Sequence, residues 1–240
     1  MRPARRPSLS DEVYESVKAQ VMDHAIAPGA RVNIDALARD LDVSPTPVRE
    51  ALARLEADGL MRKRPMSGYT TTPLLTRTEF DQLFEIRMLL EVPAAGLAAE
   101  RADADPAGLT RLTDLAQLRH ATVDASGYAG YAAFTTDDAR LHELVAVLSG
   151  NPMLTEAIRR LHAHLHLHRL YLPGGPVADT DAEHQRVAHA IGAGDAGAAR
   201  RAMREHLDNA RTRHVAVFAE QSRHPVRRRP GAGPDDPGEE

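Results

Sequence analysis

The chain has 240 residues, of which 42% are hydrophobic and 4% aromatic, and it contains neither Trp nor Cys. The absence of cysteine excludes disulfides, thiolate metal sites and a cysteine nucleophile, and no apolar run approaches the roughly 20 residues that span a bilayer. The basic N-terminus lacks the apolar segment of a secretory signal, so a cytoplasmic protein is expected, and the formal net charge of −4 means that any contact to nucleic acid has to come from local basic patches.

Residues 1–75 are predicted to form a winged helix-turn-helix domain. Good N-cap residues at Ser10 and Ser44 begin two helices, and Pro28-Gly29 and Gly59 end them. A hairpin follows, with a turn at Gly68 between its strands. The predicted elements are a helix from Ser10, helices over 34–41 and 44–59, and strands over 60–64 and 69–72.

After a linker at 73–77, the apolar periodicity is helical throughout and predicts an all-helical domain over residues 78–224. A capping box at Thr180-x-x-Glu183 is expected to begin one of its helices. The tail 225–240 is rich in Pro, Gly and charge and is expected to be disordered. The fold class is therefore mainly α, a winged helix-turn-helix followed by an all-α helical bundle. The predicted helices cover about 78–103, 107–125, 127–149, 152–172, 181–193 and 195–222.

Four polar side chains interrupt otherwise apolar helical stripes: Asp138, His142, His184 and His206. Asp138 and His142 are one helical turn apart and point the same way. Each of the four faces the expected core, where an unpaired polar group is costly. Three neutral imidazoles and a carboxylate that converge on a divalent metal ion would remove this cost and leave room for an exogenous ligand. Zn²⁺ or Ni²⁺ suits the imidazoles best, and Mn²⁺ or Mg²⁺ is the alternative given the carboxylate.

Two arginines face the same interior. Arg87 shares a stripe with Phe84 and Glu91, and Arg213 lies two turns after His206 on one face. An inward guanidinium beside a metal suits a bidentate carboxylate. Both arginines are therefore predicted to bind an acidic effector, with an ordinary ion pair, such as Arg87 with Glu91, as the alternative.

Histidines also alternate along 162–168. Alternate residues of a helix lie about 200° apart, so these four side chains cannot face one site. A partly exposed or pocket-lining helix face is the expected role of the run.

Residues 31–69 resemble the N-terminal domain of GntR-type transcription factors, through VNIDALARDLDVSPTPVREALARLEADGL and the Gly-containing wing that follows. In that family the third helix enters the major groove and the wing reaches the minor groove. The resemblance implies that Arg49 reads base edges and that hydroxyls at the start of this helix hold phosphates. The DNA-contacting residues implied are Ser44, Thr46, Arg49, Arg64 and Gly68.

Residues 79–222 look like the FCD effector domain of the FadR-like branch of the family. The matching motifs are FEIRMLLE, Asp138-x3-His142, the Ser149-Gly150-Asn151-Pro152 corner, Glu183-His184 and Glu205-His206-Leu207. Many members place a divalent metal on an Asp and three His in this order, and their effectors are often small carboxylates or sugar acids.

The resemblance implies a homodimeric, ligand-responsive repressor that binds a palindromic double-stranded DNA operator and no membrane. Two alternatives stay open. One is a metal-dependent hydrolase or oxygenase, although no adjacent acid, base, nucleophile or phosphate loop is evident in the sequence. The other is a DNA-binding protein whose metal is purely structural.

Overall fold

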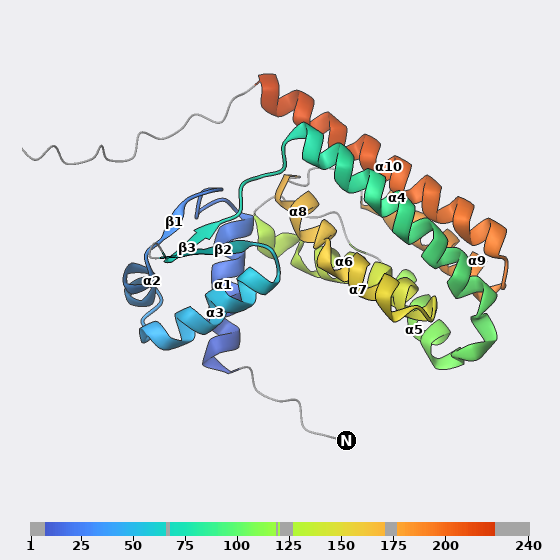
Figure 1. Ribbon diagram of the computed structural model, residues 1–240, viewed down its shortest axis with the longest axis horizontal. Helices are drawn as coiled ribbons and strands as arrows, with labels where there is room; N and C mark the ends of the chain where they lie inside the picture. Colours follow the sequence, from blue (N-terminus) through green and yellow to red (C-terminus); the bar gives the residue numbers. More distant parts are fainter. Residues whose placement is uncertain (1–7, 66–67, 119, 121–126, 171–176, 224–240) are drawn as a thin grey trace, which may run out of the picture.

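The computed structural model describes residues 8–65, 68–118, 120, 127–170 and 177–223, with side chains to residue 216. The tail 225–240, for which disorder is predicted, lies outside the described residues. Figure 1 shows a small module of helices and strands beside a longer helical half.

Apolar spacing in the first and third helices builds the core of the small module. α1 (Leu9–Met22) contributes Val17 and Val21 and α3 (Pro45–Ala57) contributes Leu52 to one buried cluster. α2 (Ile34–Asp40) lies between them in the chain. The strands β1 (Arg31–Val32), β2 (Met61–Arg64) and β3 (Gly68–Thr71) form an antiparallel sheet in the order β1-β3-β2. This arrangement is the predicted winged helix-turn-helix.

Two details of this module differ from the sequence predictions. α1 begins before Ser10, because Ser8 is its N-cap: the Ser8 hydroxyl accepts from the N–H of Asp11, and the Asp11 carboxylate accepts from the N–H of Ser8. β1 has only two residues, too few to show the alternation that predicts a strand.

The helical half places its two longest helices side by side along one edge (Figure 1). These are α4 (Arg77–Glu100) and α10 (Ala196–Arg223). Small buried side chains on α4, including Ala95, Ala98 and Ala99, allow close packing. Thr76 and Glu79 form a capping box at its start. The described elements are α4 (Arg77–Glu100), η1 (Ala102–Ala104), α5 (Pro106–Ala116), η2 (Tyr128–Gly130), α6 (Ala132–Leu148), α7 (Pro152–Arg160), α8 (Ala163–Leu170), α9 (Ala178–Gly192) and α10 (Ala196–Arg223).

Four helix boundaries predicted from the sequence are wrong. The helix expected over 127–149 begins only at Ala132, after η2. The helix expected over 152–172 is two helices, because His162 takes a φ of +45° and separates α7 from α8. The helix expected over 107–125 ends at Ala116. Thr180 is buried inside α9 rather than at its N-cap, which is Val177, so the predicted capping box does not form.

The two halves of the chain touch. Tyr128, Tyr131 and Val177 of the helical half belong to the same apolar cluster as the core of the winged module. The Asp23 carboxylate, just after α1, accepts a hydrogen bond from the N–H of Tyr128 at 2.5 Å. Among the described helices, none is both long and apolar enough to cross a membrane.

Candidate metal centre

Four polar side chains from three helices meet inside the helical half. α6 supplies Asp138 and His142 one turn apart, α9 supplies His184, and α10 supplies His206. One oxygen or nitrogen of each lies within 4.8 Å of the others, and all four residues are buried. The apolar stripe around each residue turns it inward, as the sequence predicts: Val187 and Ile191 beside His184 are fully buried. The four predicted ligands are therefore neighbours in space.

The nitrogen and oxygen atoms that these four side chains turn toward one another do not satisfy each other's hydrogen bonding. His142 Nε2 lies 3.1 Å from His206 Nε2. His184 Nε2 lies 3.2 Å from Asp138 Oδ1, but neither of these two buried atoms has a hydrogen-bond partner among the described residues. A buried polar atom without a partner is costly, so the arrangement needs something between these side chains.

Two glutamates behind the imidazoles decide their tautomers. Glu91 Oε2 lies 2.5 Å from Nδ1 of His142, and Glu183 Oε2 lies 2.8 Å from Nδ1 of His206. Burial lowers the pKa of His142 to about 3 and that of His206 to about 4, so both rings are neutral at pH 7. Each ring therefore donates its Nδ1 hydrogen to a carboxylate and keeps a lone pair on Nε2.

The residues fit a divalent cation. Two lone-pair nitrogens that face each other at 3.1 Å repel unless a positive charge lies close to both. Asp138 Oδ1 and His184 Nε2, for which the described part of the chain offers no hydrogen-bond partner, complete a set of three nitrogens and one oxygen. Carboxylate–imidazole pairs of the kind formed by Glu91 and Glu183 are the usual support behind histidine ligands.

The two arginines pair with these same glutamates. Arg87 donates from Nε and Nη2 to Glu91 at 2.6 and 3.3 Å, and Arg213 donates from Nη1 and Nη2 to Glu183 at 2.8 and 2.9 Å. Burial raises the pKa of Glu183, but hydrogen bonds from His206 and Arg213 outweigh it and lower the pKa to about 2. Both arginines therefore form ion pairs, the role that the sequence offers as the alternative to effector binding.

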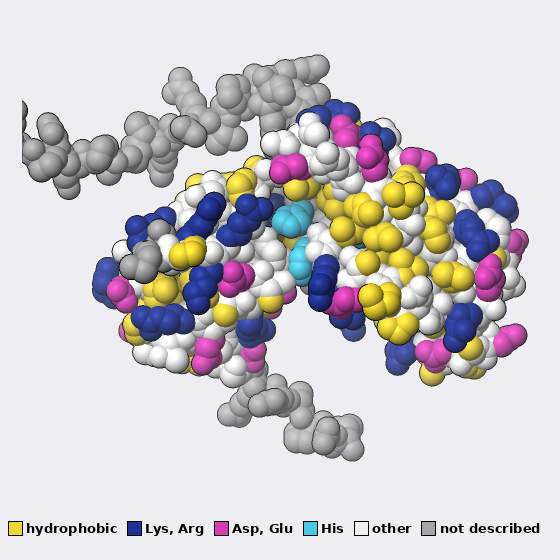
Figure 2. Space-filling model, in the orientation of Figure 1, with side chains coloured by type: hydrophobic (Ala, Val, Ile, Leu, Met, Phe, Trp, Pro, Cys, Tyr) yellow, Lys and Arg dark blue, Asp and Glu magenta, His cyan; other side chains and the backbone are white. Residues whose placement is uncertain are grey.

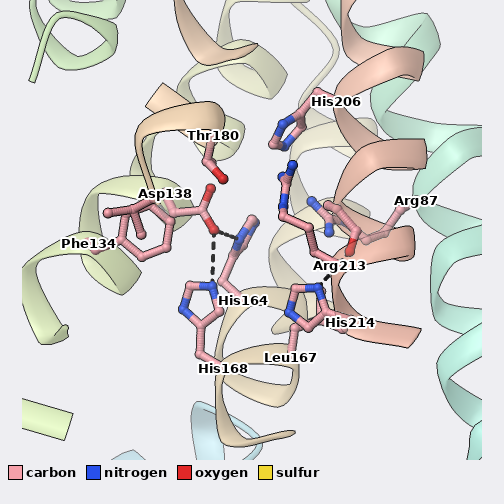
Figure 3. Close-up of a pocket in the computed structure, with 12 residues that line it drawn as sticks. Arg87, Phe134, Asp138, His164, Leu167, His168, Thr180, His206, Arg213 and His214 are labelled. Atoms are coloured by element: carbon pink, nitrogen blue, oxygen red, sulfur yellow. Dashed lines mark hydrogen bonds and ion pairs between the residues drawn. The ribbon is translucent and has the colours of Figure 1, made fainter. Parts of the chain in front are cut away.

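A small cavity of about 40 Å³ adjoins two of the four residues (Figure 3). Asp138 and His206 face it, together with Arg87 and Arg213, so both arginines also lie where an exogenous ligand would sit. The other lining residues are Phe134, His164, Leu167, His168, Val177, Thr180, Ala210 and His214.

The four alternating histidines over 162–168 point in two different directions, as their spacing predicts. His164 Nδ1 lies 2.8 Å and His168 Nε2 lies 3.5 Å from Oδ2 of Asp138, and both rings line the cavity. His162 and His166 point elsewhere, toward the winged module. The sequence interpretation missed the contacts of His164, His168, Glu91 and Glu183; only the inward stripe shared by Arg87 and Glu91 pointed to one of them.

The predicted DNA-contacting residues are all exposed. Ser44 is the N-cap of α3, and its side chain makes no capping hydrogen bond. Thr46 and Arg49 follow on α3, while Arg64 on β2 lies opposite Gly68 on β3. Gly68 has a φ of +76°, and a methyl group at its α-carbon would meet no described atom within 4 Å.

Comparison with known proteins gives two family matches. Residues 9–70 match the model of bacterial regulatory proteins of the gntR family, and residues 82–209 match the FCD domain.

Relatives and solved structures agree over most of the chain. The HTH-type transcriptional regulator LutR of Bacillus subtilis is 30% identical over 207 residues, which cover 77% of this chain and 91% of LutR. The putative L-lactate dehydrogenase operon regulatory protein of Escherichia coli is 29% identical, and the match covers 93% of both chains. The structure of E. coli McbR/YncC superposes with a TM-score of 0.63 at 25% identity, covering 90% of this chain and 99% of that one.

Proposed function

We propose a regulatory mechanism for this chain, which belongs to the GntR family of bacterial regulatory proteins and carries an FCD domain behind its DNA-binding module. It is a DNA-binding transcription regulator and not an enzyme. In our proposal the helical domain, residues 78–224, binds one divalent ion and a small carboxylate. Binding there changes how the winged module, residues 1–75, holds DNA.

The pair of Nε2 atoms that face each other at 3.1 Å, on His142 and His206, carries the metal assignment. Asp138 and His184 complete the ligand set, and three imidazoles favour Zn²⁺ or Ni²⁺ over Mn²⁺ or Mg²⁺. When bound, such an ion supplies positive charge and coordination positions for an anion.

Charge supports an acidic effector that depends on the ion. The site holds three carboxylates, of Asp138, Glu91 and Glu183, and two guanidiniums, of Arg87 and Arg213, so with neutral imidazoles it has one net negative charge. A divalent ion changes this to one net positive charge. Without metal the site therefore repels an acid, and with metal it is complementary to a monoanion.

Space limits the size of that acid. The cavity of about 40 Å³ is far below the roughly 300–1,000 Å³ of usual ligand pockets. This volume favours a small carboxylate over a sugar acid, which would require the pocket to open. Each arginine has five N–H donors and spends two on its glutamate, so Arg87 and Arg213 keep donors for the carboxylate.

For DNA binding we assign Arg49 to base edges, the Ser44 and Thr46 hydroxyls and Arg64 to phosphates, and Gly68 to close backbone approach. Their exposure and the free N-cap hydroxyl at the start of α3 support this assignment. A regulator acts where the operator DNA lies, which implies a cytoplasmic protein.

A homodimer is part of the proposal because an apolar patch lies on the helical half. Figure 2 shows apolar side chains gathered over this half. Ile86 and Leu89 of α4 and Met153 of α7 are exposed, the last two at 68% and 80%. Exposed apolar patches of this kind mark protein interfaces. A two-fold dimer would bind a palindromic operator and act as a repressor by occupying it.

Metal content tests the centre. Purified protein should hold about one divalent ion per chain, measured by plasma mass spectrometry after dialysis. His184→Ala and His206→Ala should lose most of this metal. The control is His189→Ala, at an exposed position of α9, the helix that carries His184, and it should keep the metal. Full occupancy in both core variants would contradict the assignment. Loss only in His162→Ala and His166→Ala would move the site to the histidine run.

A further inference from the structure

Helix α8 presents two faces that contact different halves of the protein. Residues three and four apart share a face of a helix, whereas neighbours two apart do not. One face lines the cavity of the proposed metal centre and consists of His164, Leu167 and His168. The other face contacts the winged module and consists of His162, at the start of the helix, Leu165, His166 and Arg169.

The first face holds the carboxylate ligand from behind. Oδ1 of Asp138 faces the proposed ion, while Oδ2 lies 2.8 Å from His164 Nδ1 and 3.5 Å from His168 Nε2. His168 Nδ1 also lies 2.7 Å from Thr135 Oγ1 on α6. Any rotation of the Asp138 carboxylate therefore acts directly on α8.

The second face lies against the end of the DNA-reading helix. Gly59 follows α3 and has a φ of +74°. A methyl group on its α-carbon would lie 3.1 Å from Cδ2 of His162 and 3.3 Å from Nε2 of His166, tighter than ordinary contact. The two rings therefore pack directly on the backbone where α3 meets the wing.

The last turn of α8 is tied to the same module. Arg169 is buried, and it donates to the hydroxyl and the carbonyl oxygen of Thr72 at 2.7 and 3.0 Å. Its own carbonyl oxygen lies 3.0 Å from Nε2 of His24, just after α1. Both ends of α8 thus contact the winged module, at Gly59 and at Thr72.

We propose that α8 transmits occupancy of the metal centre to the DNA-reading helix, through Asp138 on one face and Gly59 and Thr72 on the other. This inference rests on the proposed function, since it names the route by which the centre regulates DNA binding. A second junction exists at Asp23 and Tyr128, which does not involve α8. The experiment must therefore separate the two junctions.

The test removes the contact of α8 with Gly59 and leaves both binding sites and the Arg169–Thr72 hydrogen bonds intact. His162→Asn tolerates a positive φ, and His166→Ala keeps a good helix former. The probe is Zn²⁺ alone, and the DNA is a duplex that wild-type protein selects from a random pool. In the wild-type protein, Zn²⁺ should change the affinity for this duplex by at least about fivefold. In the double variant it should change it less than twofold, with metal content still about one ion per chain.

Two matched controls sharpen this result. Asp23→Asn weakens the other junction and should keep the wild-type Zn²⁺ response. Gly59→Ala should lose the response, whereas Gly29→Ala should keep it, because the two glycines have similar φ values of +74° and +77° but a methyl group on Gly29 meets no described atom within 4 Å. Backbone strain is therefore the same in both, and only the contact with α8 differs.

A readout without DNA completes the test. On Zn²⁺ addition, hydrogen exchange of amides 57–61 should slow in the wild-type protein and stay unchanged in the double variant. A Zn²⁺ response that survives in the double variant, in both assays, overturns transmission through the contact of α8 with Gly59 and leaves the proposed function standing. A wild-type protein that binds Zn²⁺ but shows no response in either assay overturns both.

Discussion

Glu91 and Glu183 occupy equivalent positions behind two proposed metal ligands, but their arginine partners differ in burial, so one substitution at each separates metal affinity from stability. Glu91→Gln and Glu183→Gln each remove the carboxylate that holds the Nδ1 hydrogen of a histidine. Substitutions of such supporting carboxylates commonly weaken metal binding about 10–100-fold. We expect this loss in both variants, measured by competition with a chromophoric Zn²⁺ chelator at pH 7.5.

Stability should respond differently in the two variants. Arg87 and Glu91 are each 2% exposed, so Glu91→Gln leaves a buried guanidinium without its anion at a cost of about 3–5 kcal/mol. The Arg213 side chain is 26% exposed and stays hydrated, so Glu183→Gln should cost about 1 kcal/mol or less. Urea unfolding of the metal-stripped proteins measures this difference.

A compensating variant completes the argument. Arg87→Met combined with Glu91→Gln removes the orphaned charge, so it should recover most of the lost stability but none of the lost metal affinity. Undiminished Zn²⁺ affinity in both single variants would refute the reasoning. The glutamates would then be partners of the arginines and would not orient the imidazoles.

Three further predictions concern DNA readout, pH and assembly. Arg49→Ala should cost about 1–3 kcal/mol of binding free energy on the selected duplex and leave nonspecific DNA binding unchanged. Arg64→Ala should weaken specific and nonspecific binding alike and lower the salt dependence of binding, as measured by fluorescence anisotropy titrations. An equal loss of sequence discrimination in the two variants would contradict the assignment. Burial lowers the pKa of His142 to about 3 and of His206 to about 4, so below the unfolded value of about 6.5 the unfolded chain binds more protons. The metal-stripped protein should therefore be most stable above pH 7 and lose about 2 kcal/mol per imidazole by pH 5, and a flat unfolding curve across this window would be evidence against buried neutral rings. If the proposed dimer forms through the exposed apolar patch, Leu89→Glu should reduce the mass in light scattering from that of a dimer to that of a monomer, and an unchanged mass would place the interface elsewhere.

The sequence predicts the helices and their inward faces because periodicity records burial along a single element. It therefore places Asp138, His142, His184 and His206 on the core side of their helices, and the structure brings them within 4.8 Å of one another. The mainly α fold and the winged module are confirmed for the same reason.

Contacts between elements are harder to predict. The carboxylates that hold His142 and His206 come from α4 and α9, and no spacing within one helix indicates such pairing. The break at His162 also has no warning, since neither glycine nor proline marks it, although its φ of +45° is left-handed. Thr180 is predicted at a helix start from a four-residue pattern, but α9 begins two residues earlier, at Ala178.

The most direct test compares the Zn²⁺ response of DNA binding in wild-type protein and in His206→Ala. Affinity for the selected duplex is measured with Zn²⁺ and after chelation, at fixed salt. We predict at least about a fivefold change for the wild-type protein and no change for His206→Ala, whose affinity should equal that of the metal-stripped wild-type protein. The same response in both proteins would show that the metal centre formed by Asp138, His142, His184 and His206 does not control DNA binding.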